Sequence, residues 1–171
     1  ENAQPDLVVL AKGLSAGYSP LGALIAPNLI VEAIVNHGGF LHGHTYASNP
    51  LSCAVASAVL SEIQDKGLVA NCAAMGVYLK NELEDLAEKS NIIGDVRGLG
   101  LLLAIEIVAN KSTKEIFSSK FRAVYRLAEI GMENGILLHT RKTANRAFGE
   151  WLMITPPFIC SIKQIDHLIE L

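Results

Sequence analysis

The sequence is short of charge, and it has no excess of basic residues. Only 18% of the 171 residues are Asp, Glu, Lys or Arg, and the formal net charge is −3, whereas charged residues make up about 25% of a typical soluble domain. Without an excess of basic residues the chain has no general electrostatic attraction to the phosphate backbone of nucleic acids, so we expect no nucleic-acid partner. Because half of the residues are hydrophobic, we expect a partner to cover part of the surface.

Cysteine is also scarce. The three cysteines, Cys53, Cys72 and Cys160, are an odd number without C-x-x-C spacing, so the sequence suggests neither a disulfide framework nor a zinc knuckle. This usage fits a reducing compartment, and we expect a cytoplasmic protein.

Long apolar runs and targeting signals are missing as well. A membrane-spanning helix needs about 18 or more consecutive apolar residues, but Pro27, Asn28 and Glu32 interrupt the longest candidate and Glu106 interrupts the next. We therefore expect no membrane segment. The chain opens with ENAQPD, without an initiator methionine or the basic and apolar regions of a signal peptide. We expect it to start within a longer protein.

What the sequence does contain is an alternation of strand and helix signals. Short apolar runs lie at 7–11 and 21–27, and the valine-rich first run is typical of a strand buried on both faces. A helix over about 49–66 can be capped by Ser48 or Asn49 and has Pro50 in its first turn. Further patterns predict helices at 29–39, 68–90, 117–134 and 161–171, a strand or hairpin at 96–108, and strands at 135–140 and 151–155. This order predicts an α/β or α+β chain.

One lysine stands at the end of the first predicted strand, in VVLAKGLSAG. There the stem of Lys12 can point into the crevice where open α/β sheets bind ligands. Partial burial would favour the neutral amine, which is the form that attacks a carbonyl. The small residues that follow leave space for a flat ring. The alternative is that Lys12 only extends to solvent at a strand end.

The same stretch contains GLSAG, which satisfies the G-x-S-x-G pattern of hydrolase nucleophile elbows. That motif needs a strand, a sharp turn and then a helix, but a turn and a second strand are predicted after Ser15. A hydrolase triad of Ser15, Asp95 and His139 stays an alternative, and so does an ordinary turn serine.

Four stretches together resemble landmarks of the class III, or omega, aminotransferases. In family order they are PDLVVLAKGLSAGYSPLGALIAP, HGHTYASNPLSCAVA, DVRGLGLLLAIEI and LMITPPFICSIKQID. The resemblance implies a fold-type-I α/β enzyme that uses pyridoxal 5′-phosphate. It implies three parts: the C-terminal part of the large cofactor domain at 1–50, a connecting helix at 51–66 and a small α+β domain at 67–171.

The resemblance also gives roles to two residues. Lys12 forms the Schiff base with pyridoxal phosphate and then moves a proton between substrate and cofactor, as a residue that is both nucleophile and base can do. Thr45 matches a threonine that meets the cofactor phosphate of the neighbouring subunit, which implies a homodimer. A hydroxyl near the start of a helix suits an anion, although an ordinary turn threonine is the alternative.

Substrate recognition is less uniform within the family. The ornithine-type branch has an arginine three residues before the Pro-Pro pair, where this chain has Met153. RAFGEWLMITPP resembles the amine and β-amino acid branch instead, in which Arg146 would bind a substrate carboxylate from a mobile loop. The alternative is a solvated basic loop. Arg97 matches a family position that we interpret as structural support.

Two histidines, His42 and His44, flank Gly43 with one-residue spacing. No carboxylate or cysteine lies nearby at ligand spacing, so we expect hydrogen-bonded loop histidines and no metal site.

The resemblance implies a ping-pong aminotransferase acting on an amine or ω-amino acid and an α-keto acid. An aminomutase or decarboxylase of the same fold, a serine hydrolase and a non-catalytic relative stay open as alternatives. The pyridinium aspartate, the ring-stacking aromatic and the phosphate cradle of the family lie upstream of the lysine and cannot be located here. We therefore expect this stretch alone to have negligible activity.

Overall fold

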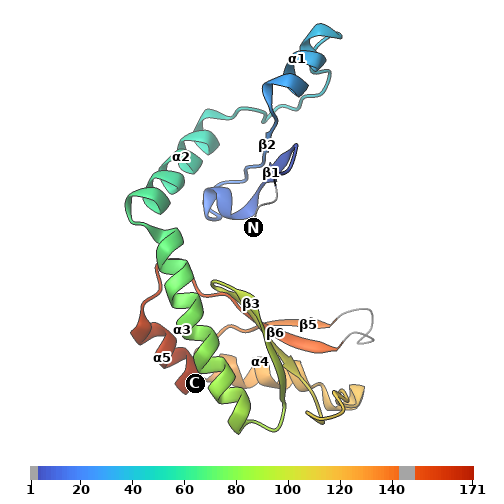
Figure 1. Ribbon diagram of the computed structural model, residues 1–171, viewed down its shortest axis with the longest axis vertical. Helices are drawn as coiled ribbons and strands as arrows, with labels where there is room; N and C mark the ends of the chain where they lie inside the picture. The colour runs from blue at the N-terminus through green and yellow to red at the C-terminus, as the bar shows by residue number, and fades with distance from the viewer. Residues whose placement is uncertain (1–3, 143–148) are drawn as a thin grey trace. The chain divides into compact units, whose positions relative to one another are not determined.

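The computed structural model describes residues 4–142 and 149–171, with Lys142 described by its backbone only. It divides the chain into two compact units, Glu1–Lys66 and Gly67–Leu171. Figure 1 shows the helices and strands of both. Each unit is described by itself below.

The first unit begins with a two-stranded antiparallel sheet. Strand β1 (Val8–Leu10) pairs with β2 (Ala23–Ile25), and Val9 lies opposite Leu24. Both strands were predicted, but the expectation that the first is buried on both faces is wrong, because the side chain of Val9 is 79% exposed. A two-stranded sheet cannot cover its own faces.

Two helices complete this unit. Helix α1 (Asn28–Asn36) follows β2, and α2 (Pro50–Asp65) comes after an irregular loop. Asn49 caps α2, since its Oδ1 accepts hydrogen bonds from the amides of Leu51 (3.1 Å) and Ser52 (3.2 Å). One of the two predicted caps is thus confirmed, and Pro50 occupies the first helical position, where a missing N–H costs nothing.

The second unit is built on a four-stranded antiparallel sheet in the order β3-β4-β6-β5. Helix α3 (Leu68–Lys89) leads into the hairpin of β3 (Ile93–Leu99) and β4 (Leu102–Ile107), which confirms the hairpin predicted from the sequence. The sheet is completed by β5 (His139–Lys142) and β6 (Glu150–Ile154).

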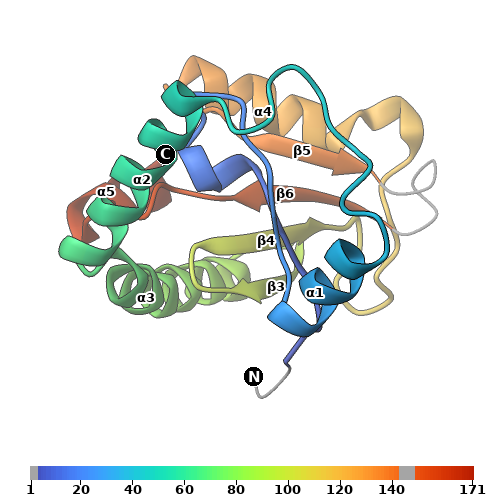
Figure 2. The same ribbon diagram turned by 90° about the horizontal axis from the view of Figure 1, so that it is seen from above.

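The helices of the second unit bury one face of this sheet. Helix α3 packs along β3, and α4 (Ala123–Glu133) packs along β5, as Figure 2 shows from above. Helix α5 (Ile162–Glu170) packs on α3. The alternating burial of β4 and β6 gives the sheet a core face and an open face. The core contains Leu79, Leu83, Ile93, Leu101, Leu103, Ile105, Ile107, Ala123, Val124, Leu152, Ile154, Cys160 and Ile165.

Two predicted elements differ from the structure. The helix predicted at 117–134 is divided, because Arg122 adopts a left-handed backbone (φ 54°) between a short 3-10 turn (η2, Ser119–Phe121) and α4. The strand predicted at 135–140 begins later, at His139. Both boundaries depend on backbone choices that hydrophobic patterns do not encode.

The terminal helix α5 begins after Ser161, as predicted. The Oε1 atom of Gln164 accepts from the amide of Ser161 at 2.9 Å and from its hydroxyl at 3.1 Å. Among the helices of the described residues, none combines the length and apolar character needed to cross a membrane.

Candidate active site

Lys12 opens the turn that follows strand β1. It is the first residue of a short 3-10 helix (η1, Lys12–Ser15), and its φ of 54° lies in the left-handed region. This conformation costs a residue with a side chain on the order of 1–3 kcal/mol and is concentrated at functional sites. Within residues 4–142 and 149–171, the Lys12 amine makes no hydrogen bond and no ion pair.

The surroundings of Lys12 are open. Its side chain is exposed, so the described residues do not supply the partial burial that we expected. A Cβ built on Gly13 or Gly17 would have no heavy atom within 4 Å from any described residue other than the glycine and its two chain neighbours. The predicted space beside the lysine is therefore present.

Ser15 is not an exposed nucleophile. Its side chain is 2% exposed, and its Oγ donates to the carbonyl oxygen of Ser19 at 2.5 Å. The proposed partners Asp95 and His139 lie on β3 and β5, at opposite edges of the sheet. Three strand spacings of about 4.8 Å separate β3 from β5, so the two residues are at least about 14 Å apart. The structure therefore excludes the triad and favours the turn serine.

Thr45 lies in the loop before α2. It is exposed, and neither its hydroxyl nor its amide donates a hydrogen bond within the described part of the chain. A hollow of about 620 Å³ adjoins this loop, lined by Pro20, Leu21, Gly22, His44, Tyr46, Ala47, Ser48, Asn49, Leu51 and Ser52. A small ligand could reach this loop from solvent.

The first free amides of α2 are already occupied. The helix begins at Pro50, and the cap residue already accepts from the first free amides, those of Leu51 and Ser52. An anion at this loop would therefore depend on the hydroxyl and amide of Thr45 more than on the helix terminus.

The loop histidines make local contacts. His44 Nδ1 accepts from the amide of Tyr46 at 3.2 Å, and the ring of His42 meets that of Phe40 edge-on, with centroids 6.1 Å apart. Among the described residues, no three His, Cys, Asp or Glu side chains gather as metal ligands.

The second unit carries the residue expected to distinguish the substrate branches. Met153 on β6 is half-buried and lies opposite Ala104 and His139 in the sheet register. It belongs to the open face, since its neighbours Leu152 and Ile154 belong to the core. Arg146 lies outside the described residues.

Arg97 also lies on this sheet. Its Nη1 contacts Asp95 Oδ2 at 2.8 Å and Glu106 Oε2 at 3.2 Å. The hydrogen bond that Arg97 donates to Asp95 is the main reason that the pKa of Arg97 is raised. The pair with Asp95 lies within β3, and the pair with Glu106 joins β3 to β4, in agreement with the structural role that we expected.

One pair of residues was not predicted from the sequence. The hydroxyls of Ser19 and Ser52 lie 2.7 Å apart and are hydrogen-bonded, although 33 positions separate them. They join the segment that carries Lys12 to the helix that follows Thr45. Serines in turns and first helical turns are too common to signal such a contact.

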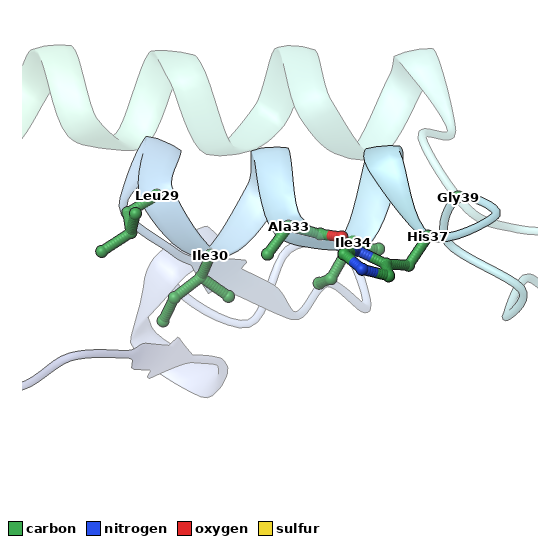
Figure 3. Close-up of a pocket in the computed structure, with 6 residues that line it drawn as sticks. All are labelled: Leu29, Ile30, Ala33, Ile34, His37 and Gly39. Atoms are coloured by element: carbon green, nitrogen blue, oxygen red, sulfur yellow. Dashed lines mark hydrogen bonds between the residues drawn. The ribbon is translucent and has the colours of Figure 1, made fainter.

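A second hollow, on α1, has a different character. Figure 3 shows Leu29, Ile30 and Ala33 along one side of the helix, with His37 at its end. The Nδ1 atom of His37 lies 2.7 Å from the carbonyl oxygen of Ala33. This groove of about 600 Å³ is mainly apolar, so we assign no chemistry to it.

Comparison with known proteins identifies the chain. A family model described as "Aminotransferase class-III" matches residues 1–171. The putrescine–pyruvate aminotransferase of Pseudomonas aeruginosa is 34% identical over 98% of this chain and 35% of its own.

Solved structures agree with this match. A transaminase from the marine bacterium Virgibacillus superposes with a TM-score of 0.93, at 32% identity over 99% of this chain and 38% of that one. An amine transaminase from an uncultivated Pseudomonas species, in its PLP-bound (internal aldimine) form, gives 0.85 at 32% identity over 97% of this chain and 37% of that one. The expected fold is confirmed.

The chain thus spans little more than a third of the length of these relatives. It belongs to the class III aminotransferase family.

Proposed function

We propose that this chain supplies the lysine-bearing part of a pyridoxal-phosphate-dependent aminotransferase. The enzyme would move an amino group between an amine or ω-amino acid and an α-keto acid in a ping-pong reaction. One observation carries the proposal: in a chain of this family, the Lys12 amine extends unpaired, within the described residues, from a left-handed residue at a strand end. A reactive amine must be free of ion pairs to attack a carbonyl.

The residues present fit pyridoxal phosphate. Lys12 offers a primary amine for the aldehyde, and Thr45 offers a hydroxyl and an amide that no other described residue occupies for the phosphate. The similar Pseudomonas structure is described as PLP-bound. When bound, the cofactor supplies the electron sink for the reaction.

The chain's own residues would then orient and transfer protons. Lys12 would hold the cofactor through Nζ, and once free the same nitrogen would take a proton from the substrate carbon. The hydroxyl of Thr45 would orient the phosphate of the cofactor held by the partner subunit, so that two chains would form each site.

The substrate and the molecular context follow from the same proposal. Met153 replaces an arginine, so we propose an amine or β-amino acid donor, with Arg146 binding the carboxylate of the acceptor. We further propose residues 1–50 as part of a large cofactor domain, 51–66 as a connecting helix, 67–171 as a small domain, and a cytoplasmic homodimer.

Borohydride reduction in the presence of pyridoxal phosphate, followed by peptide mass mapping, tests the proposal in the natural gene product. We expect the cofactor mass on the peptide that contains Lys12. Lys12→Ala should abolish the label and lower turnover by at least about 10²–10⁴-fold, the contribution of a positioned proton-transfer group.

The matched control is Lys120→Ala, which removes an exposed lysine outside the proposed site. It should retain the label and the turnover. Normal turnover after Lys12→Ala would refute the proposal, and a label without turnover of any amine would assign the chain to a non-catalytic relative.

A further inference from the structure

The turn that carries Lys12 is held by a hydrogen bond from a buried serine hydroxyl. Ser15, at the end of η1, is 2% exposed, and its Oγ donates to the carbonyl oxygen of Ser19 at 2.5 Å. This bond closes the segment that runs from the 3-10 helix to Ser19. The hydroxyl of Ser19 is then free to hydrogen-bond that of Ser52, on the first turn of α2, at 2.7 Å.

From Ser52 the contacts continue into the loop that carries Thr45. The amide of Ser52 donates to Asn49 Oδ1 at 3.2 Å, and the amide of Asn49 donates to the carbonyl oxygen of Tyr46 at 3.2 Å. Tyr46 directly follows Thr45 in the chain, and its own amide donates to His44 Nδ1. The Thr45 loop and the Lys12 turn are therefore both connected to Ser52 by hydrogen bonds.

The Ser19–Ser52 pair connects two parts of the first unit that lie on either side of α1 in the sequence. In the part of this unit that the structure describes, it is the only side-chain hydrogen bond between the residues before α1 and the residues after it. The pair is partly buried, so water competes with it less than with a surface contact.

We propose that Ser19 and Ser52 are positioning residues that couple the Lys12 turn to the Thr45 loop. The inference rests on the proposed function, in which Lys12 binds the cofactor of its own subunit and Thr45 meets the phosphate of the other. The hydroxyl pair then links two different active sites of a homodimer.

The experiment compares pyridoxal phosphate with pyridoxal, which has the same aldehyde but lacks the phosphate. In the natural gene product, binding to each is measured by absorbance, and attachment to Lys12 is checked by reduction and mass mapping. We expect Ser19→Ala to lower the affinity ratio of phosphate form to dephospho form about fivefold, which corresponds to a net hydrogen bond of about 1 kcal/mol. The substitution is thus made in the segment that carries Lys12, and its effect is measured on phosphate binding, which the proposal assigns to Thr45.

The pair predicts non-additive effects. Ser52→Ala should lower the ratio as much as Ser19→Ala, and the double variant should lower it no further. Ser52→Thr, which keeps a hydroxyl, should restore most of the ratio. Ser61→Ala is the matched control, because Ser61 is an exposed serine of α2 whose hydroxyl makes no hydrogen bond within the described residues.

Hybrid dimers test the link between subunits. One subunit carries Lys12→Ala, so only its partner binds the cofactor covalently. Adding Ser19→Ala to the Lys12→Ala subunit should lower the phosphate preference of its unaltered partner. Adding it instead to the subunit that binds the cofactor should leave that preference unchanged, and the reverse result would overturn the inference.

The failure of this inference is distinct from that of the proposed function. If the wild type takes up no cofactor at Lys12, the proposed function fails. If it does, with a phosphate preference that neither serine variant changes, the coupling is refuted. Should Ser19→Ala fail to fold, Ser19→Cys keeps the size with a weaker donor and must show the same loss.

Discussion

At Gly76 the backbone of α3 touches the turn between β3 and β4. A Cβ built on this residue would lie 2.3–2.5 Å from backbone atoms of Gly100, which is far inside van der Waals contact. Because backbone atoms cannot swing aside as a side chain can, the contact requires glycine in a helix where alanine is otherwise preferred.

Gly76→Ala should therefore reverse the usual sign of a helical glycine-to-alanine change. We expect it to lower the free energy of unfolding by about 1–3 kcal/mol, the usual cost of overpacking, whereas an open site would gain up to about 1 kcal/mol. Chemical denaturation measures the difference. Ala74→Gly, at an exposed position of the same helix, should cost only about 1 kcal/mol. A stabilised Gly76→Ala variant would contradict the close contact.

At the scale of secondary structure, α3 ends on a cation from a distant loop. The Nζ of Lys111 donates to the carbonyl oxygens of Ala87 (2.5 Å) and Ser90 (2.9 Å). The carbonyl of Ala87 lies in the last turn and that of Ser90 at the C-cap, where the helix dipole favours positive charge.

Lys111→Met should remove this cap and lower the free energy of unfolding by about 1–2 kcal/mol. The control is Lys89→Met, which removes another cation from the last turn of α3 but no hydrogen bond of the described residues. If denaturant titrations gave the two variants equal losses in the free energy of unfolding, the effect of Lys111 would come from its charge and not from its hydrogen bonds.

Helix α3 is also joined to α5, by a tyrosine. The hydroxyl of Tyr78 donates to Asp166 Oδ1 at 2.6 Å, and this hydrogen bond is the main reason that the pKa of Tyr78 rises from 10.0 to about 12. The folded state thus holds the phenolic proton more tightly than the unfolded chain does. The stabilisation is complete below pH about 10 and is lost as the pH rises toward 12.

Tyr78→Phe should lower the stability of the second unit at neutral pH and remove this part of its alkaline dependence. Thermal unfolding between pH 9 and about 12 measures both effects. Tyr125→Phe, on α4, is the control tyrosine, because it leaves the hydrogen bond between α3 and α5 intact. If the stability of Tyr78→Phe depended on pH between 9 and about 12 as that of the wild type does, the hydrogen bond between Tyr78 and Asp166 would not cause this dependence.

For the whole molecule, the two units differ sharply in burial. Of the buried hydrophobic residues in the described part of the chain, only Ala56 belongs to the first unit. Large apolar side chains of that unit stay exposed, including Leu7, Val9, Leu24, Ile25, Leu29, Val35, Phe40 and Leu41. An apolar surface of this extent is typical of a segment that packs against further protein.

Expressed separately, the units should therefore behave differently. We expect residues 67–171 to unfold in one cooperative thermal transition, because they have a continuous core. Residues 1–66 should show none, since a two-stranded sheet and two helices without a core are marginal in water. Circular dichroism melts decide between these outcomes, and a cooperative transition in 1–66 would contradict the distribution of burial.

The features of the fold that could be predicted from the sequence are those with local signals. The bounds of α3 were predictable because Gly67 and the spaced leucines of the helix are local signals, and the proposal for Lys12 also comes from a local motif. The left-handed Arg122 that delays α4 was not, because no residue type encodes such a backbone apart from glycine and, more weakly, asparagine. The exposure of Val9 was missed because burial depends on what covers a strand, which its own residues do not state.

The contact between Gly76 and Gly100 also limits how the length of this chain can vary. An α-helix turns by about 100° per residue, so inserting or deleting one residue between Gly76 and Leu83 would rotate one of them away from the sheet. Surface loops have no such constraint. Natural variation in length among relatives should therefore fall in the loops and spare this stretch of α3.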